Sequence, residues 1–191
     1  MGSDARGRGP RLVSDDFGRI LVAGALRIAV TRAESPAPFA VDAVVLEEDT
    51  HLLLSAPPDL QASTSSLRTA LADAVAAPAV TPGSVVVRPG RPPSLLAVVH
   101  DLDRDPSWRD GWIDAAFAEV LRHATRAGMR ALAIPLLGTR HGRARPDRVA
   151  RQLADRLTAL SPRSSVRAVW VPCHPDAVAG ARAAIEERLR R

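Results

Sequence analysis

Several residue types are scarce in this chain of 191 residues, and each scarcity excludes a class of protein. The single cysteine, Cys173, excludes an internal disulfide, and no Cys and His cluster has the spacing of a zinc site. No apolar run approaches the roughly 20 residues that a membrane-spanning helix needs. We therefore expect a soluble protein of a reducing, cytoplasmic compartment, without a bound metal or other cofactor.

Lysine and asparagine are absent, so all 26 basic residues are arginine and the formal net charge is +5. This arginine-rich composition suits phosphate, because a guanidinium donates two parallel hydrogen bonds to its oxygens. Aromatic residues make up only 3% of the chain, too few for the stacking platforms of proteins that bind single-stranded nucleic acid. Nucleic acid is therefore an open but less favoured partner.

The length suits one domain with a substantial core. Residues 1–18 are rich in Gly, Arg and Asp, and we expect them to be a flexible leader before a single domain over residues 19–191. The sequence predicts no oligomeric state.

Short apolar segments alternate with segments of helical periodicity, a pattern typical of a largely parallel sheet covered on both faces. The expected strands are 20–31 (a strand or a bent strand pair), 41–46, 85–88, 95–100, 131–136 and 166–171. The expected helices are 66–77, 110–127, 146–160 and 175–189.

The segment from Ala131 to Leu153 has the order strand, loop, helix that creates a ligand site in such sheets. Its loop has two glycines that allow close backbone approach, and the helix after it has free amides and a positive dipole end. Its arginines, Arg140, Arg143 and Arg145, match phosphate. The loop predicts a phosphate-bearing ligand, although a tight connection explains the spacing equally well. The candidate binding residues are Gly138, Thr139, Arg140, His141 and Gly142.

This loop, together with the end of the strand before it, resembles the macrodomain family. The run Ala133–Gly142 is similar to a family segment in which a buried strand ends in Pro and a Gly/Ser-Thr-Gly loop binds the diphosphate of ADP-ribose. The strand at 41–45, the turn at 81–83 and the strand at 98–100 resemble further family segments in the same order. The resemblance spans about residues 20–189 and implies an α/β fold, a three-layer α/β/α sandwich with a mixed, mainly parallel central sheet.

Three departures from the family concern its ligand contacts. Leu46-Glu47-Glu48-Asp49 stands where the family has Asn-Ala-Ala-Asn, and no shift of alignment restores an asparagine that the chain lacks. Asp49 falls at the second Asn and is expected to accept hydrogen bonds from the distal ribose. The family's first glycine-rich loop corresponds to about residues 54–66 of this chain, and these contain no glycine. The hydroxyls of Ser65 and Ser66 are therefore the hydrogen-bond donors that this segment offers to a phosphate, unless they only cap a helix. Glu34 is the acid nearest the family's adenine-binding Asp.

Three hypotheses follow for the function. The first is a divergent macrodomain-like module that binds ADP-ribose or a related nucleotide diphosphate. The second is a degenerate macrodomain that serves as a protein-interaction module without a nucleotide. The third is an ADP-ribosyl hydrolase that uses Asp49 or Glu48 as an atypical acid; the missing asparagines argue against catalysis. Because neighbours on a strand face opposite ways, only one of Glu47 and Glu48 is expected to face the cleft.

Overall fold

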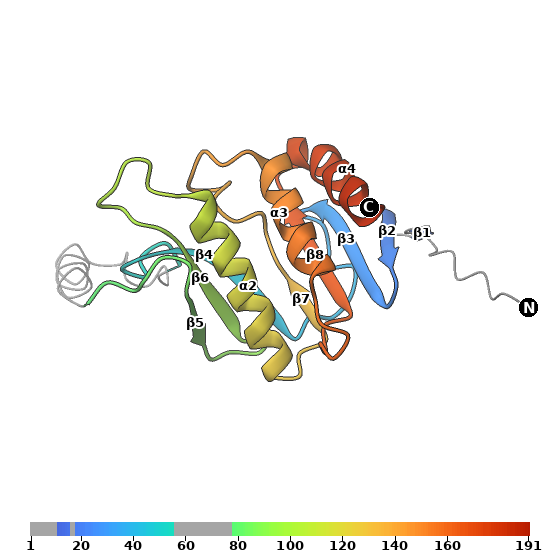
Figure 1. Cartoon of the computed structure of the whole chain (residues 1–191), viewed down its shortest axis with the longest axis horizontal. Helices are drawn as coiled ribbons and strands as arrows, with labels where there is room; N and C mark the ends of the chain where they lie inside the picture. Colours follow the sequence, from blue (N-terminus) through green and yellow to red (C-terminus); the bar gives the residue numbers. More distant parts are fainter. Residues whose placement is uncertain (1–10, 16–17, 56–77) are drawn as a thin grey trace, which may run out of the picture.

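The computed structural model describes residues 11–15, 18–55 and 78–191, and an eight-stranded sheet runs through these residues in the order β1-β2-β3-β8-β7-β4-β6-β5 (Figure 1). The strands are β1 Arg11–Asp15, β2 Gly18–Ala23, β3 Leu26–Arg32, β4 Ala43–Asp49, β5 Val85–Arg88, β6 Ser94–His100, β7 Ala131–Ala133 and β8 Ala168–Cys173. The helices are α2 Asp110–Arg126, α3 Pro146–Thr158 and α4 Val178–Leu189, and a 3-10 turn, η2 Pro175–Ala177, precedes α4.

The centre of the sheet is parallel and its edges are antiparallel. Strands β3, β8, β7, β4 and β6 run parallel to one another, whereas β1, β2 and β5 pair antiparallel with their neighbours. The connections through α2 and α3 allow the parallel pairings, because a crossover helix returns the chain to the same end of the sheet. The expectation of an α/β fold with a mixed, mainly parallel sheet is confirmed.

Helices α2, α3 and α4 lie side by side on one face of the sheet (Figure 1). Each has an apolar stripe at helical spacing; in α3 the buried members include Val149, Leu153 and Leu157. In α2 the stripe includes Phe117, which has no exposed surface. Burial of a side chain of this size stabilises the fold by roughly 1.5–3 kcal/mol. The core thus lies between this helical layer and the parallel strands, and it fixes the strand ends at which the ligand was expected.

Several boundaries differ from those expected from the sequence. The segment 20–31 is a hairpin of β2 and β3, with Gly24 at φ +60° in the turn. Strand β7 ends three residues early, because Pro135 has no amide to continue the ladder after the amide of Ile134 bonds to the carbonyl of Trp170. Strand β8 begins and ends two residues later than expected.

The expected leader and first helix lie partly outside the described residues. Within the leader expected over 1–18, β1 pairs antiparallel with β2 and extends the sheet. The helix expected over 66–77 lies outside the described residues. In the part of the chain that the structure describes, no helix has the length and apolar character needed to cross a membrane.

Asp42 joins the start of β4 to the start of β7, and its role predicts a pH-dependent stability. One oxygen of its carboxylate accepts the amide of Arg130 at 2.6 Å and that of Ala131 at 2.9 Å. These two hydrogen bonds hold the pKa of Asp42 below its ordinary value. The stabilisation is therefore present above the unfolded-state pKa of about 4 and is lost as pH falls through the folded-state pKa.

We expect Asp42→Ala to lower the melting temperature at neutral pH, and the difference from the wild type to narrow below about pH 4. Thermal unfolding followed across this pH range tests the expectation. Asp105→Ala is the control, because that residue is exposed and forms no ion pair among the described residues. A difference for Asp42→Ala that stays constant down to pH ~2 would contradict the assignment.

Candidate functional site

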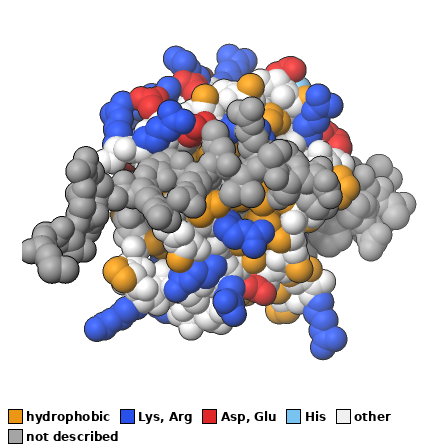
Figure 2. Space-filling model, turned by 90° about the vertical axis from the view of Figure 1, so that its right-hand side faces the viewer, with side chains coloured by type: hydrophobic (Ala, Val, Ile, Leu, Met, Phe, Trp, Pro, Cys, Tyr) orange, Lys and Arg blue, Asp and Glu red, His pale blue; other side chains and the backbone are white. Residues whose placement is uncertain are grey.

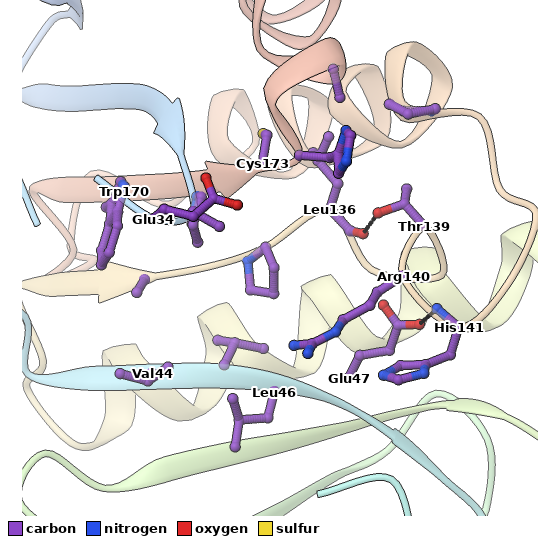
Figure 3. A pocket seen from close by; sticks show the side chains of 18 of the residues that line it. Glu34, Val44, Leu46, Glu47, Leu136, Thr139, Arg140, His141, Trp170 and Cys173 are labelled. Atoms are coloured by element: carbon purple, nitrogen blue, oxygen red, sulfur yellow. Dashed lines mark hydrogen bonds between the residues drawn. The ribbon is translucent and has the colours of Figure 1, made fainter. Parts of the chain in front are cut away.

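A cavity of about 1080 Å³ opens at the carboxyl ends of β3, β4, β7 and β8 (Figure 3). Its position is the one where open α/β sheets bind ligands. The strands supply an apolar wall that includes Val44, Leu46 and Trp170, and the indole N–H of Trp170 donates to the hydroxyl of Thr31 at 2.9 Å. The other side is formed by the loop after β7 and by the residues around η2. The segment that the sequence singled out therefore does border a cavity.

The loop between β7 and α3 is a tight turn that depends on two glycines. Gly138 has φ +76°, a conformation that side chains other than glycine rarely adopt. A Cβ on Gly142 would lie 2.5 Å from the carbonyl oxygen of Gly138 and 2.7 Å from the ring of Trp108. The hydroxyl of Thr139 donates to the carbonyl of Leu136 and closes the turn. Both glycines are thus required by close packing within the protein.

Glu47, at the end of β4, places its carboxylate inside this turn (Figure 3). Its two oxygens accept the amide of Gly138 at 2.8 Å and the amide of His141 at 3.1 Å. The oxygen bonded to His141 also lies 2.5 Å from Nε2 of His100, on β6. Both side chains of this pair are buried, so the hydrogen bonds replace the hydration that the carboxylate loses.

Arg140 is the cationic group of the loop that lines the cavity (Figure 3). Among the described residues its guanidinium forms no ion pair, and the amides of Arg140 and Gly142 donate to no protein acceptor. The N-terminal end of α3 follows directly, and no side chain caps it at Arg145. Free amides, a guanidinium and a helix N-terminus together make this edge of the loop electropositive.

The structure places Asp49 and Glu48, the two acids expected to act on a ligand, away from the cavity lining. Both side chains are fully buried. The carboxylate of Asp49 accepts the amide of His51 at 2.6 Å and those of Leu53 and Leu54 at 3.0 Å. The alternation along β4 turns Glu48 away from Glu47, and it accepts the amide of Leu54 at 2.7 Å. These carboxylates hold the turn after β4.

Glu34, the acid expected to meet adenine, is exposed and lines the cavity (Figure 3). Ser65 and Ser66 lie outside the described residues. Cys173 also lines the cavity, but burial raises the pKa of its thiol to about 12, so the reactive thiolate is scarce at neutral pH. Within the described residues no group of three His, Cys, Asp or Glu side chains suits a metal ion.

The structure brings Glu47 to the loop, and the sequence offered only a partial signal for it. Strand alternation indicated that one of two adjacent glutamates faces the cleft, but it gave no reason to choose Glu47 over Glu48. The choice depends on a contact with Gly138, which lies 91 residues further along the chain.

The packing of Gly142 predicts that alanine there is destabilising. Because the added Cβ would meet a backbone oxygen at 2.5 Å, the loop must shift, and we expect Gly142→Ala to lower the free energy of unfolding by about 1–3 kcal/mol. The matched control is Gly180→Ala in α4, where nothing lies within 4 Å and alanine is expected to stabilise by about 0.5–1 kcal/mol. Denaturant unfolding measures both, and an unchanged Gly142→Ala variant would contradict the packing.

No protein-family model and no curated protein sequence matches the chain. Several solved structures, in contrast, do match the chain. The macrodomain of Oceanobacillus iheyensis with ADP matches with a TM-score of 0.64 at 10% identity, over 93% of this chain and 97% of that one. A mutant of the same macrodomain with ADPR matches with a TM-score of 0.64 at 11% identity, over 95% and 100% of the two chains.

Macrodomains of other origin match as well. The macrodomain of Thermus aquaticus DarG has a TM-score of 0.53 at 20% identity, over 77% of this chain and 97% of that one. The macro domain of ganglioside induced differentiation associated protein 2 has a TM-score of 0.58 at 12% identity, over 97% and 90%. The order of strands, the position of the cavity and these likenesses agree: this chain has the macrodomain fold.

Proposed function

We propose that this chain binds ADP-ribose or a related nucleotide diphosphate in the cavity at the carboxyl ends of β3, β4, β7 and β8. The proposal rests mainly on the electropositive edge of this cavity, formed by the guanidinium and the backbone amide of Arg140. The volume of about 1080 Å³ is ample for a nucleotide. Solved structures of the same fold with ADP and with ADPR support the choice of ligand.

The diphosphate belongs at the Arg140 end of the cavity. A guanidinium donates two parallel hydrogen bonds to phosphate, and such charge-assisted bonds are about twice as strong as neutral ones. The positive end of α3 adds to the attraction. Arg140 thereby provides the main contact with the diphosphate, a role that the resemblance assigned to the backbone of a glycine-rich loop.

The nucleoside belongs along the apolar wall of the strands. The apolar wall that includes Val44, Leu46 and Trp170 suits an aromatic base, which gains from leaving water. Glu34 lines the same cavity, and its carboxylate can accept a hydrogen bond from the amino group of adenine. Binding of this kind needs no cofactor and no metal.

A protein-interaction module without a nucleotide is the second candidate, and Glu47 is the observation that favours it. Its carboxylate occupies the amides of Gly138 and His141, which a phosphate would otherwise use. The hydrolase hypothesis has weaker support, because Glu48 and Asp49 are engaged with backbone amides away from the cavity. Catalysis therefore forms no part of the proposal.

Nucleic acid is the less favoured ligand, because many of the arginines are paired with acids. Figure 2 shows basic side chains interspersed with acidic ones on the face in view. The pairs on the helices and at the end of α4 include Arg122–Glu119, Arg148–Asp110, Arg156–Asp114, Arg188–Asp155, Arg190–Glu186 and Arg191–Glu187. Such pairing lowers the positive potential that attracts a phosphate backbone.

Isothermal titration with ADP-ribose tests the proposal. We expect saturable binding by the wild type and a loss of about 10- to 100-fold in affinity for Arg140→Ala, the effect of removing a charge-assisted hydrogen bond. Arg143→Ala is the matched control, because Arg143 is an exposed arginine of the same loop outside the cavity lining. No heat and no thermal shift at millimolar ADP-ribose, or equal losses in the two variants, would count against the proposal.

A further inference from the structure

The carboxylate of Glu47 is chemically an anion bound in the loop between β7 and α3. We propose that Glu47 is an internal counter-anion that masks the inner amides of this loop and thereby determines where, and how strongly, a phosphate ligand binds. The part of the inference that concerns the ligand's position rests on the proposed function. The masking itself does not depend on any particular nucleotide.

The geometry of the contact supports this role. The oxygens of Glu47 bond separately to two amides, Gly138 at 2.8 Å and His141 at 3.1 Å. Two amides converging on two oxygens of one anionic group are the arrangement by which backbone turns bind phosphate. The side chain is only 5% exposed, so water does not compete with the contact. The inner part of the loop is thus an anion site that the protein fills with its own side chain.

His100 keeps the carboxylate in place. Its Nε2 lies 2.5 Å from the Glu47 oxygen that also bonds to His141, and its own side chain is 1% exposed. On its other side, Nδ1 of His100 lies 3.4 Å from the hydroxyl of Ser107. A ligand that displaced Glu47 would have to break three hydrogen bonds in a buried site and leave His100 without its acceptor. Displacement is therefore unfavourable, and a phosphate remains at the outer edge.

The outer edge, where the loop borders the cavity, consists of the guanidinium and the backbone amide of Arg140. A phosphate bound there lies on the same short loop as a fixed negative charge, and like charges repel at this range. The repulsion is greatest for groups with two charges on one phosphorus, such as a terminal phosphate. The site therefore favours a diphosphate esterified at both ends, in which each phosphorus has one charge. Glu47 acts as a specificity-determining residue through this charge.

Removal of the charge of Glu47 with little change of shape tests the inference. We expect Glu47→Gln to bind inorganic pyrophosphate about tenfold or more tightly than the wild type does, because it loses a like charge and releases one amide. Glu187→Gln is the control; it makes the same change of net charge on α4, where the side chain is 54% exposed. Isothermal titration measures all three proteins, and equal or weaker binding by Glu47→Gln would overturn the inference.

The two titrations, with pyrophosphate and with ADP-ribose, separate the masking by Glu47 from the binding of a nucleotide. Tighter pyrophosphate binding by Glu47→Gln, together with no ADP-ribose binding by the wild type, rejects the proposed function and keeps the masking. ADP-ribose binding by the wild type, with no gain in pyrophosphate affinity in Glu47→Gln, rejects the masking and keeps the proposed function.

If Glu47→Gln does not fold, the inference is tested by titrating the wild type with pyrophosphate and following its backbone amide resonances by NMR. Pyrophosphate is then expected to shift the amide resonance of Arg140 and to leave those of Gly138 and His141 near their free positions. A larger shift at Gly138 and His141, or no shift at any of the three, would overturn the inference.

Discussion

The buried carboxylate of Glu47 is the constraint on which the candidate site depends. It joins three segments that are distant in the sequence: the end of β4, the end of β6 at His100, and the loop after β7 at Gly138 and His141. A charge removed from water is stable only when donors surround it, so these segments must meet at this point. The shape of the loop, and with it one side of the cavity, follows from the contact.

The end of β4 uses three consecutive acids to organise three different stretches of backbone. Glu47 holds the loop after β7, whereas Glu48 and Asp49 hold the turn over residues 50–55, in which Leu52 adopts φ 58°. The resemblance to macrodomains implied ligand-binding carboxamides at Leu46 and Asp49, with alanines at Glu47 and Glu48 between them. Carboxylates accept hydrogen bonds but do not donate them, so they bind the protein's own amides here. The fold is retained with a different distribution of polar contacts around the cavity.

Much of the fold follows from local patterns in the sequence. Helix α3 is indicated by the spacing of its apolar residues and by Pro146 at its start. The strands of the sheet are indicated by their short apolar runs. The strand, loop and helix from Ala131 to Leu153 are present in that order, although β7 is shorter than expected because Pro135 interrupts the ladder. Element types were predictable because each depends on residues close in the sequence.

The roles of individual side chains were less predictable. Strand alternation separated Glu47 from Glu48 but did not identify which one would meet a loop 91 residues away. Asp49 aligned with a ligand-binding position of the family, yet its carboxylate is buried among the amides of the next turn, where a bulge shifts the register of β4. Tertiary contacts of this kind are decided by packing, which the local sequence does not encode.

A crystal structure of the chain with ADP-ribose would show both where the diphosphate binds and whether Glu47 keeps its contacts with the loop. We expect the diphosphate at the guanidinium and backbone amide of Arg140, with the nucleoside along the wall of Val44 and Trp170 and with Glu47 still bonded to Gly138. A cavity without nucleotide at millimolar ADP-ribose, or a diphosphate on the amides of Gly138 and His141 with Glu47 displaced, would contradict this expectation.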